Sequence, residues 1–127
     1  MTNIIWINES DTILIHERLL ALNGGAVGIR DYGLLQSALA RPQQFLNYSD
    51  HPTIIDLAAS YIIGIVKNHP FIDGNKRVGF AVGILFMEMN GYTFTASANA
   101  ATEAILAVAS GDMKETGLGL FLKENSQ

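Results

Sequence analysis

The spacing of apolar residues predicts helices along most of this chain. Between Ser10 and Gly24 the apolar residues recur at the spacing of one helix face. Ser10 is the expected N-cap of this segment, and the Gly24-Gly25 pair is its expected stop. A second helix is expected to begin after Asp31, which is a common N-capping residue, and to end at Pro42.

The segment around and after Pro42 is not expected to be helical. Residues 41–52, with the sequence RPQQFLNYSDHP, lack a helical pattern and carry several turn-forming residues. We therefore expect a loop or a small hairpin there.

The most apolar segments lie in the middle of the chain. Residues 53–69 are apolar on nearly all sides, which predicts a buried central helix. Pro70 disfavours a helical conformation at the residue before it, so this helix is expected to end within residues 68–69. The next helical pattern begins at about Asn75 and ends at the Asn-Gly pair at 90–91.

The last third of the chain predicts two more helices. Residues 97–112 have a helical pattern with Ser97 or Asn99 as the cap, and residues 114–125 form a last short helix. Two β-branched and aromatic stretches, residues 4–7 and 92–95, predict short strands. Together these patterns predict an all-α fold, a compact bundle of about six helices with minor short strands.

Composition narrows the possible classes of function. The 127 residues include no cysteine, which excludes a disulfide framework, a thiolate zinc site and a cysteine nucleophile. The net charge of -4 disfavours direct nucleic-acid binding, because such proteins usually carry a basic excess. The N-terminal sequence lacks the pattern of a secretory signal, and the longest apolar runs are too short to span a bilayer. We expect a cytoplasmic protein of one domain, residues 1–127, without a membrane or direct nucleic-acid partner.

One polar stretch interrupts the apolar centre of the chain. The sequence KNHPFIDGNKRVGF, residues 67–80, places a short loop directly before the start of a helix. A helix start offers free backbone N–H groups and a partial positive charge, and Gly74 permits close approach of a ligand. Lys76 and Arg77 add two cations in the first turn, where they oppose the helix dipole. This combination predicts a phosphate site, with a solvated patch of surface charge as the alternative.

Asp73 and His69 supply the reactive groups at this junction. Asp73 either holds Mg²⁺, which binds carboxylate and phosphate oxygens together, or caps the following helix. His69 is expected to act as a base or as a hydrogen-bond donor to phosphate, with a purely structural histidine as the alternative. Pro70 breaks the helical geometry between His69 and Asp73, so no zinc site is expected from this pair. Phe71 is expected to anchor the loop in the core.

The nine residues HPFIDGNKR resemble the signature of the Fic/Doc family, His-x-Phe-x-(Asp/Glu)-(Gly/Ala)-Asn-x-Arg. Residues 24–43 and the Asn-Gly-Tyr sequence at 90–92 are similar to the flanking segments of Doc-like (death-on-curing) toxins. The resemblance implies ATP and Mg²⁺ as cofactors. It also implies a role for each motif residue: His69 as the general base, Asp73 as the Mg²⁺ ligand, Gly74 and Asn75 as the anion hole, and Arg77 as the phosphate clamp.

Lys76 decides which reaction the resemblance implies. Family members that transfer AMP carry glycine at this position, whereas Doc-like members with lysine are understood to present the γ-phosphate of ATP. The expectation is a Ser/Thr protein kinase toxin that phosphorylates a threonine of elongation factor Tu and so blocks translation. Phe80 stands where AMP-transferring members often carry arginine, which also disfavours AMP transfer. AMP transfer and a catalytically silent antitoxin-binding module are the alternatives.

Several other positions have two interpretations each. Lys67 either reaches the nucleotide phosphates or is a solvated cation at a helix end. Arg30 either lines the same cleft or caps the neighbouring helix, whereas His16 is expected to pack in the core. Residues 41–52 stand where the family places a flap that docks the target as an added strand. Phe45 and Tyr48 either serve in that docking or anchor the loop.

The sequence also lacks the built-in inhibitor that many family members carry. That inhibitory helix has the pattern Ser/Thr-x-x-x-Glu-(Gly/Asn). Here Glu124-Asn125 is the only glutamate followed by glycine or asparagine, and Leu120 stands where serine or threonine is needed. The resemblance therefore implies inhibition in trans by a Phd-like antitoxin, whose disordered tail folds into a groove on the toxin.

Overall fold

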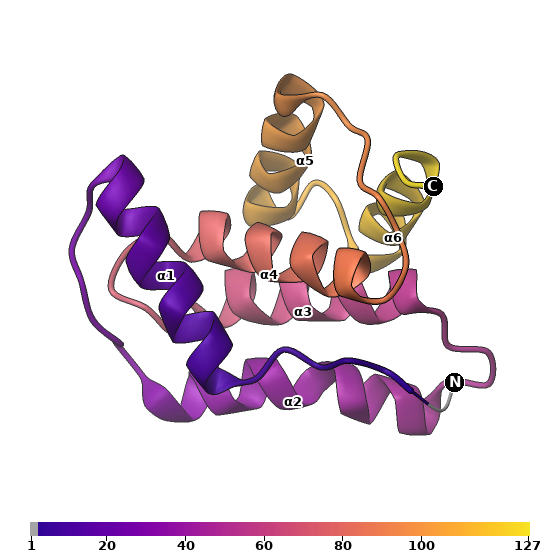
Figure 1. The fold of residues 1–127 in the computed structure, drawn as a ribbon, viewed down its shortest axis with the longest axis horizontal. Coiled ribbons are helices and arrows are strands. Elements are labelled where there is room, and N and C mark those ends of the chain that lie inside the picture. The colour runs from indigo at the N-terminus through magenta and orange to yellow at the C-terminus, as the bar shows by residue number, and fades with distance from the viewer. Residues whose placement is uncertain (1–2) are drawn as a thin grey trace.

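The computed structural model describes residues 3–127 and shows the expected all-α architecture (Figure 1). Its helices are α1 (Glu9–Asn23), α2 (Tyr32–Tyr48), α3 (Ile54–Asn68), α4 (Asn75–Met89), α5 (Ala98–Ser110) and α6 (Glu115–Glu124). Among the described residues, no helix is long and apolar enough to cross a membrane.

Helix α3 is the centre of the bundle. It contacts α2, α4, α5 and α6, and every residue from Leu57 to Val66 is buried. This explains why its sequence is apolar on nearly all sides, since no face of the helix meets water. Helix α4 packs closely against α3, and both flank the polar loop that joins them (Figure 1).

Two of the predicted N-caps are confirmed, since Asp31 caps α2 and Ser97 caps α5, each accepting a backbone N–H in the first turn. Thr53, which was not predicted, caps α3 in the same way. The prediction for α1 was wrong by two residues, because Asn8 and not Ser10 is the N-cap. Asn8 forms a reciprocal capping box with Asp11, which satisfies one more backbone donor than a serine cap alone.

The predicted loop at 41–52 is largely helical. Helix α2 continues through Pro42 to Tyr48, so the expected stop at Pro42 and the expected loop over 41–48 were wrong. Pro42 is buried, and Phe45 packs against the core. Arg41 binds Glu115 on α6 and Ser60 on α3. These tertiary contacts offset the backbone hydrogen bond that a proline removes from a helix.

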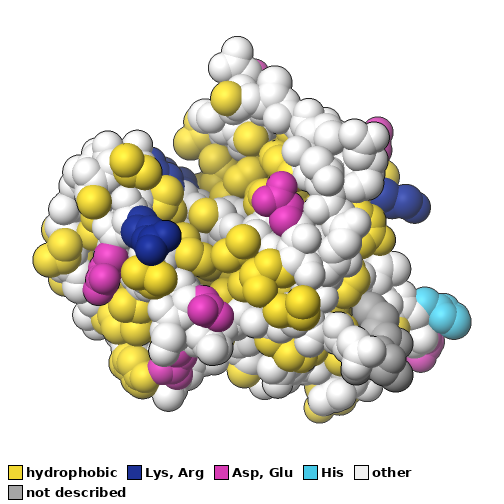
Figure 2. All heavy atoms as spheres, viewed as in Figure 1, with side chains coloured by type: hydrophobic (Ala, Val, Ile, Leu, Met, Phe, Trp, Pro, Cys, Tyr) yellow, Lys and Arg dark blue, Asp and Glu magenta, His cyan; other side chains and the backbone are white. Residues whose placement is uncertain are grey.

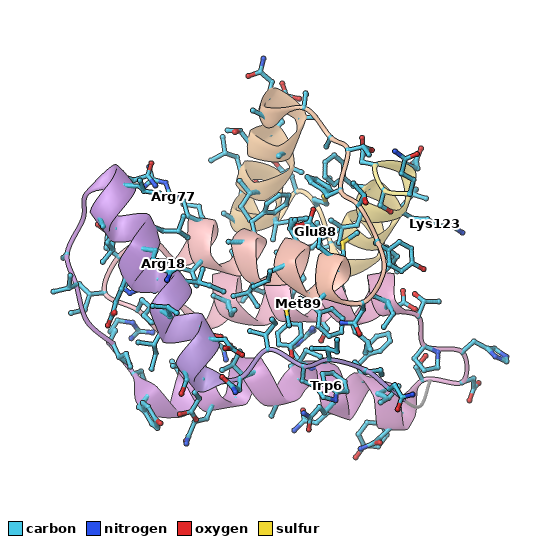
Figure 3. All side chains as sticks on the ribbon, viewed as in Figure 1. Trp6, Arg18, Arg77, Glu88, Met89 and Lys123 are labelled. Atoms are coloured by element: carbon cyan, nitrogen blue, oxygen red, sulfur yellow. The ribbon has the colours of Figure 1, made fainter. Side chains whose placement is uncertain are left out.

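Neither predicted strand forms a continuous strand within residues 3–127. The segment 4–7 pairs with no other strand. Its backbone bonds instead to side chains, Ile5 to the amide of Asn90 and Ile7 to the hydroxyl of Tyr61. Trp6, which is labelled in Figure 3, packs on Phe86 of α4. The two ring centroids are 5.8 Å apart. The segment 92–95 does pair with another extended piece, but only through an isolated antiparallel bridge to the C-terminal residues, Phe94 with Ser126.

Candidate active site

The candidate site is built on the loop between α3 and α4. His69 ends α3 with φ 53° and ψ 53°, and it is the only non-glycine residue with positive φ among residues 3–127. A side chain in this left-handed conformation is unfavourable, and such residues concentrate at functional sites. The helix therefore ends where the sequence predicted, and its C-cap residue, His69, is exposed at the mouth of the loop.

Buried contacts hold this loop to the core. Phe71 is 1% exposed and stacks on His16 of α1, with ring centroids 3.9 Å apart. The side chain of Asn75 bonds to both the N–H and the carbonyl of Phe71. His16 Nε2 lies 2.8 Å from the Asp73 carbonyl and donates to it. Phe71 is thus the predicted anchor, and His16 is the predicted packing residue with an additional bond to the loop.

A second extended segment lies beside the loop. Ile72 N–H donates to Gly28 O at 3.1 Å, and Ile29 forms an antiparallel bridge with Phe71. Arg30 caps α3, as one of its two interpretations predicted, because its guanidinium donates to the last carbonyls of that helix. Residues 24–31, and not 41–52, are therefore the extended backbone next to the site.

The flap expected at residues 41–52 is wrong for residues 41–48, which belong to α2. Backbone groups within α2 are used in the helix, so residues 41–48 cannot accept an added strand. Phe45 lines a second cavity of about 480 Å³ together with Thr53 and Leu120, away from the loop, and Tyr48 is 88% exposed. The sequence signal for the segment beside the loop was its glycines, since Gly24, Gly25 and Gly28 all have positive φ.

Asp73 is exposed and partly engaged by backbone groups. Its Oδ1 accepts the N–H of Gly74 at 2.8 Å, and its Oδ2 accepts the N–H of Ala26 at 3.3 Å. A Cβ on Gly25 would lie 2.7 Å from Asp73 Oδ2, so a side chain there would displace the carboxylate, and the φ of 125° also favours glycine. The alternative in which Asp73 caps α4 does not hold, because the N-cap is Gly74 and no side chain caps the helix.

This carboxylate fits Mg²⁺ better than it fits a metal held by protein alone. Among the described residues, no cluster of three or more histidine, cysteine, aspartate or glutamate side chains is present to enclose an ion. Mg²⁺ is commonly held by one or two carboxylates together with substrate phosphates and water. An exposed aspartate next to a helix start with free N–H groups has that chemistry.

The start of α4 supplies the anion-binding groups. Gly74 has φ 80°, and the backbone N–H groups of Asn75, Lys76 and Arg77 have no acceptor among residues 3–127. Lys76 and Arg77 are exposed, and the only ion pair in the described part of the chain joins Arg41 to Glu115. Two unpaired cations thus stand on the positive end of a helix dipole, which favours a bound polyanion over a structural ion pair.

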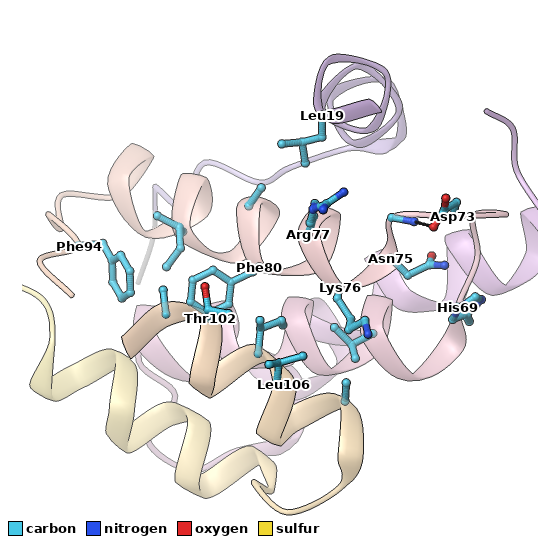
Figure 4. Close-up of a pocket in the computed structure, with 17 residues that line it drawn as sticks. Leu19, His69, Asp73, Asn75, Lys76, Arg77, Phe80, Phe94, Thr102 and Leu106 are labelled. Atoms are coloured by element: carbon cyan, nitrogen blue, oxygen red, sulfur yellow. Dashed lines mark hydrogen bonds between the residues drawn. The ribbon is translucent and has the colours of Figure 1, made fainter. Parts of the chain in front are cut away.

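These groups lie at one end of a cleft of about 1130 Å³ (Figure 4). Its polar end is formed by the motif residues His69, Asp73, Gly74, Asn75, Lys76 and Arg77, so the structure brings six of the seven predicted site residues together. Lys67, the seventh, is exposed on the last turn of α3 but does not line the cleft.

The other end of the cleft is apolar. Phe80 and Ile84 of α4 face Ile105 and Leu106 of α5, and Phe94 closes the wall. Phe80 meets Phe94 edge to face at 5.7 Å, so this position is part of the apolar wall. Figure 2 shows the hollow on the molecular surface between α1 and α5, with hydrophobic atoms along it. The cleft therefore has a charged end, whose groups suit a phosphate, and an apolar groove at the other end.

Comparisons with known proteins point in the same direction. The model of the Fic/DOC family matches residues 6–87. A relative named Toxin Doc from Mycolicibacterium smegmatis is 40% identical over 74 residues, which are 58% of this chain and 57% of that protein. A relative named Protein kinase doc from Escherichia phage P1 is 27% identical over 85 residues, or 67% of this chain and 68% of that protein. The match to the first relative thus spans little more than half of its length.

Proposed function

The chain belongs to the Fic/DOC family, and we propose that it is the toxin of a toxin–antitoxin pair that transfers the γ-phosphate of ATP to a hydroxyl of a protein. The observation that carries this proposal is the meeting of a base, a carboxylate and two unpaired cations at one end of the cleft. The relatives named Toxin Doc and Protein kinase doc support it.

Each residue has a stated part in the proposed reaction. His69 takes the proton from the acceptor hydroxyl, and the oxygen attacks the γ-phosphorus. A new P–O bond forms, the bond between the γ-phosphorus and the β–γ bridging oxygen breaks, and ADP leaves. Arg77 and the free N–H groups of the first turn of α4 bind the charged oxygens of the transferred group.

Asp73 is the proposed ligand of Mg²⁺. When bound, the ion neutralises charge on the phosphate oxygens and orients them. The bond from Gly74 N–H to Asp73 Oδ1 limits the rotation of the carboxylate and keeps it beside the anion-binding turn. Asp73 also bonds to Ala26 of the neighbouring segment, so both sides of the site position the same group.

Lys76 is the proposed determinant of γ-phosphate transfer. Its side chain is exposed and lines the cleft at the second residue of α4. AMP-transferring members of the family have glycine at this position, which leaves space for the α-phosphate. A lysine fills that space and adds a cation, which favours a nucleotide that presents its terminal phosphate instead.

The acceptor protein is proposed to dock beside residues 24–31. These residues are the extended backbone next to the loop, and Val27 is 72% exposed on it. An extended peptide that pairs with exposed backbone brings its side chains to defined positions, here toward His69. By family resemblance the acceptor is a threonine of elongation factor Tu, and the action takes place in the cytoplasm.

The apolar end of the cleft is proposed to hold the antitoxin. A Phd-like tail that folds on binding needs an apolar groove for one helix face, and the wall of Phe80, Ile84, Phe94 and Ile105 provides one. Because this groove is continuous with the polar end, a peptide seated there also obstructs access to the phosphate site.

ATP labelled separately at the α- and γ-phosphates tests the proposed reaction. The protein is incubated with purified elongation factor Tu, Mg²⁺ and each labelled ATP, with His69→Ala as the control. We expect label from the γ position only, and none with the variant. Label from the α position alone would establish AMP transfer instead.

Expression in growing cells separates catalysis from binding. We expect the wild type to arrest growth and His69→Ala to permit it. If wild type and variant arrest growth equally, or if neither does, His69 is not a catalytic base, and the catalytically silent binding module becomes the favoured alternative.

A further inference from the structure

Arg30 makes an unusual set of contacts with the end of α3. Its guanidinium donates from Nε to the carbonyl of His69 at 2.7 Å and from Nη2 to the carbonyl of Asn68 at 3.0 Å. Its backbone N–H donates to the carbonyl of Pro70 at 2.7 Å. One residue therefore binds three consecutive carbonyls, and the middle one belongs to His69.

These carbonyls need partners from outside the helix. The last carbonyls of an α-helix accept no N–H from within the helix, and they carry its partial negative charge. A guanidinium matches both needs, since it supplies several N–H donors and a positive charge. No carboxylate competes for this group, because within residues 3–127 the single ion pair involves Arg41 and not Arg30.

The conformation of His69 is the reason why such support matters. Its φ of 53° and ψ of 53° are unfavourable for a residue with a side chain, and Pro70 restricts the residue before it further. A backbone held in a sparsely populated conformation persists only when neighbouring groups determine it. The direction of the imidazole depends on that backbone conformation.

We propose that Arg30 is a positioning residue that fixes the backbone of His69 and thereby aims its imidazole into the cleft. The inference rests on the proposed function of His69 as the base. Arg30 does not line the cleft, so it acts through His69 and not by touching the nucleotide. It also joins the site to residues 24–31, because its backbone belongs to that segment and its side chain to the end of α3.

The first test compares kinetic constants. Arg30→Ala is expected to lower kcat about 100-fold, because a small displacement of a catalytic group has effects of that size. The KM for ATP should stay within about two-fold, since the anion-binding groups lie on α4. Arg30→Lys retains a cation and should recover part of kcat.

Arg41→Ala is the matched control for a general loss of stability. Arg41 also joins helices through its guanidinium, bonding to Ser60 and Glu115, but it does not contact the loop. We expect it to lower the melting temperature without lowering kcat below that temperature. Equal losses of kcat in Arg30→Ala and Arg41→Ala would overturn the proposal.

The second test does not depend on activity. The amide of His69 donates to Ile65 O at 3.1 Å, and its hydrogen exchange reports whether the end of α3 is held. Arg30→Ala should accelerate this exchange about ten-fold while the amides of α5 and α6 keep their rates. Unchanged exchange at His69 overturns the positioning role. Faster exchange in a protein whose wild type transfers no phosphate keeps the positioning role and rejects the proposed function.

Discussion

The side chain of Asn75 forms two hydrogen bonds with the backbone of Phe71, both 2.9 Å long. Oδ1 accepts the N–H of Phe71, and Nδ2 donates to its carbonyl. Asn75 is 3% exposed, so its side chain is committed to the loop. In the proposed anion hole Asn75 would therefore act through its backbone N–H, while its side chain shapes the loop that carries Asp73.

Asn75→Ala is expected to destabilise the protein by about 2–4 kcal/mol, because it removes both bonds and leaves two buried backbone groups of Phe71 unpaired. Chemical denaturation monitored by circular dichroism measures the loss. Asn125→Ala is the control, since that amide donates one local bond, to Phe121 O, and should cost less than about 1 kcal/mol. Equal losses in the two variants would contradict the role of Asn75.

Lys76→Gly is expected to weaken γ-phosphate transfer and to permit transfer of AMP. The lysine is exposed in the cleft, so its removal opens space at the start of α4 without disturbing the core. Incubation with ATP labelled at the α or the γ position measures both reactions in the same variant. Lys67→Gly is the control, because Lys67 does not line the cleft. Undiminished γ-transfer in Lys76→Gly would remove the argument that the lysine selects the phosphate.

Most helix boundaries follow from local chemistry and were therefore predictable. Asp31, Thr53 and Ser97 accept backbone N–H groups of their own helices, and Pro70 ends α3, so the signal and its effect lie close together in the sequence. Pro42 shows where this reasoning fails. Its effect on α2 is decided by contacts with α3 and α6, which are distant in the sequence and give no local signal.

The candidate site likewise has a part that could be predicted from local sequence and a part that depends on long-range contacts. The motif residues 69–77 are contiguous, so their meeting at one end of the cleft was predictable from the sequence alone. The neighbouring segment at 24–31 was not placed, because its position depends on bonds such as Arg30 N–H to Pro70 O, formed across forty residues of chain. His16 was expected to pack, but its bond to Asp73 O required the structure.

Gly83→Ala is expected to destabilise the protein by about 1–3 kcal/mol, because α3 and α4 leave no room for a side chain there. A Cβ on Gly83 would lie 2.4 Å from Ile62 Cγ1 and 3.1 Å from the backbone oxygen of Ala58. Gly119→Ala is the matched control on α6, where the nearest atom is 4.0 Å away. That variant should gain about 0.5–1 kcal/mol from reduced freedom of the unfolded chain. A gain in both variants would show that the two helices can separate at little cost.

Tyr61 is expected to make the protein sensitive to alkaline pH. Burial raises the pKa of its hydroxyl from 10.0 to about 12, partly opposed by its hydrogen bond to Ile7 O. The folded state thus binds the proton more tightly than the unfolded state does. The stabilisation that the protonated hydroxyl contributes is complete below pH 10. As the pH rises toward 12, the free energy of unfolding falls by roughly 2–3 kcal/mol.

Denaturation at a series of pH values measures this dependence. Tyr61→Phe is expected to be less stable at neutral pH, because it loses the bonds to Ile7, but to lose less stability than the wild type between pH 10 and 12. Tyr48→Phe is the control, since the Tyr48 side chain is 88% exposed, and it should follow the wild-type curve. If the stability of wild type and of Tyr61→Phe falls in parallel between pH 10 and 12, groups other than Tyr61 cause the alkaline loss of stability.

His69→Gly is expected to be more stable than His69→Ala by about 1 kcal/mol, although both variants lack the proposed base. The left-handed conformation of residue 69 suits glycine and penalises any side chain. The imidazole is exposed, so its loss removes little packing that would offset the gain. Denaturant titration compares the two variants, and the γ-phosphate assay should show that neither transfers phosphate. If His69→Gly is no more stable than His69→Ala, the left-handed conformation of residue 69 costs the folded protein no stability.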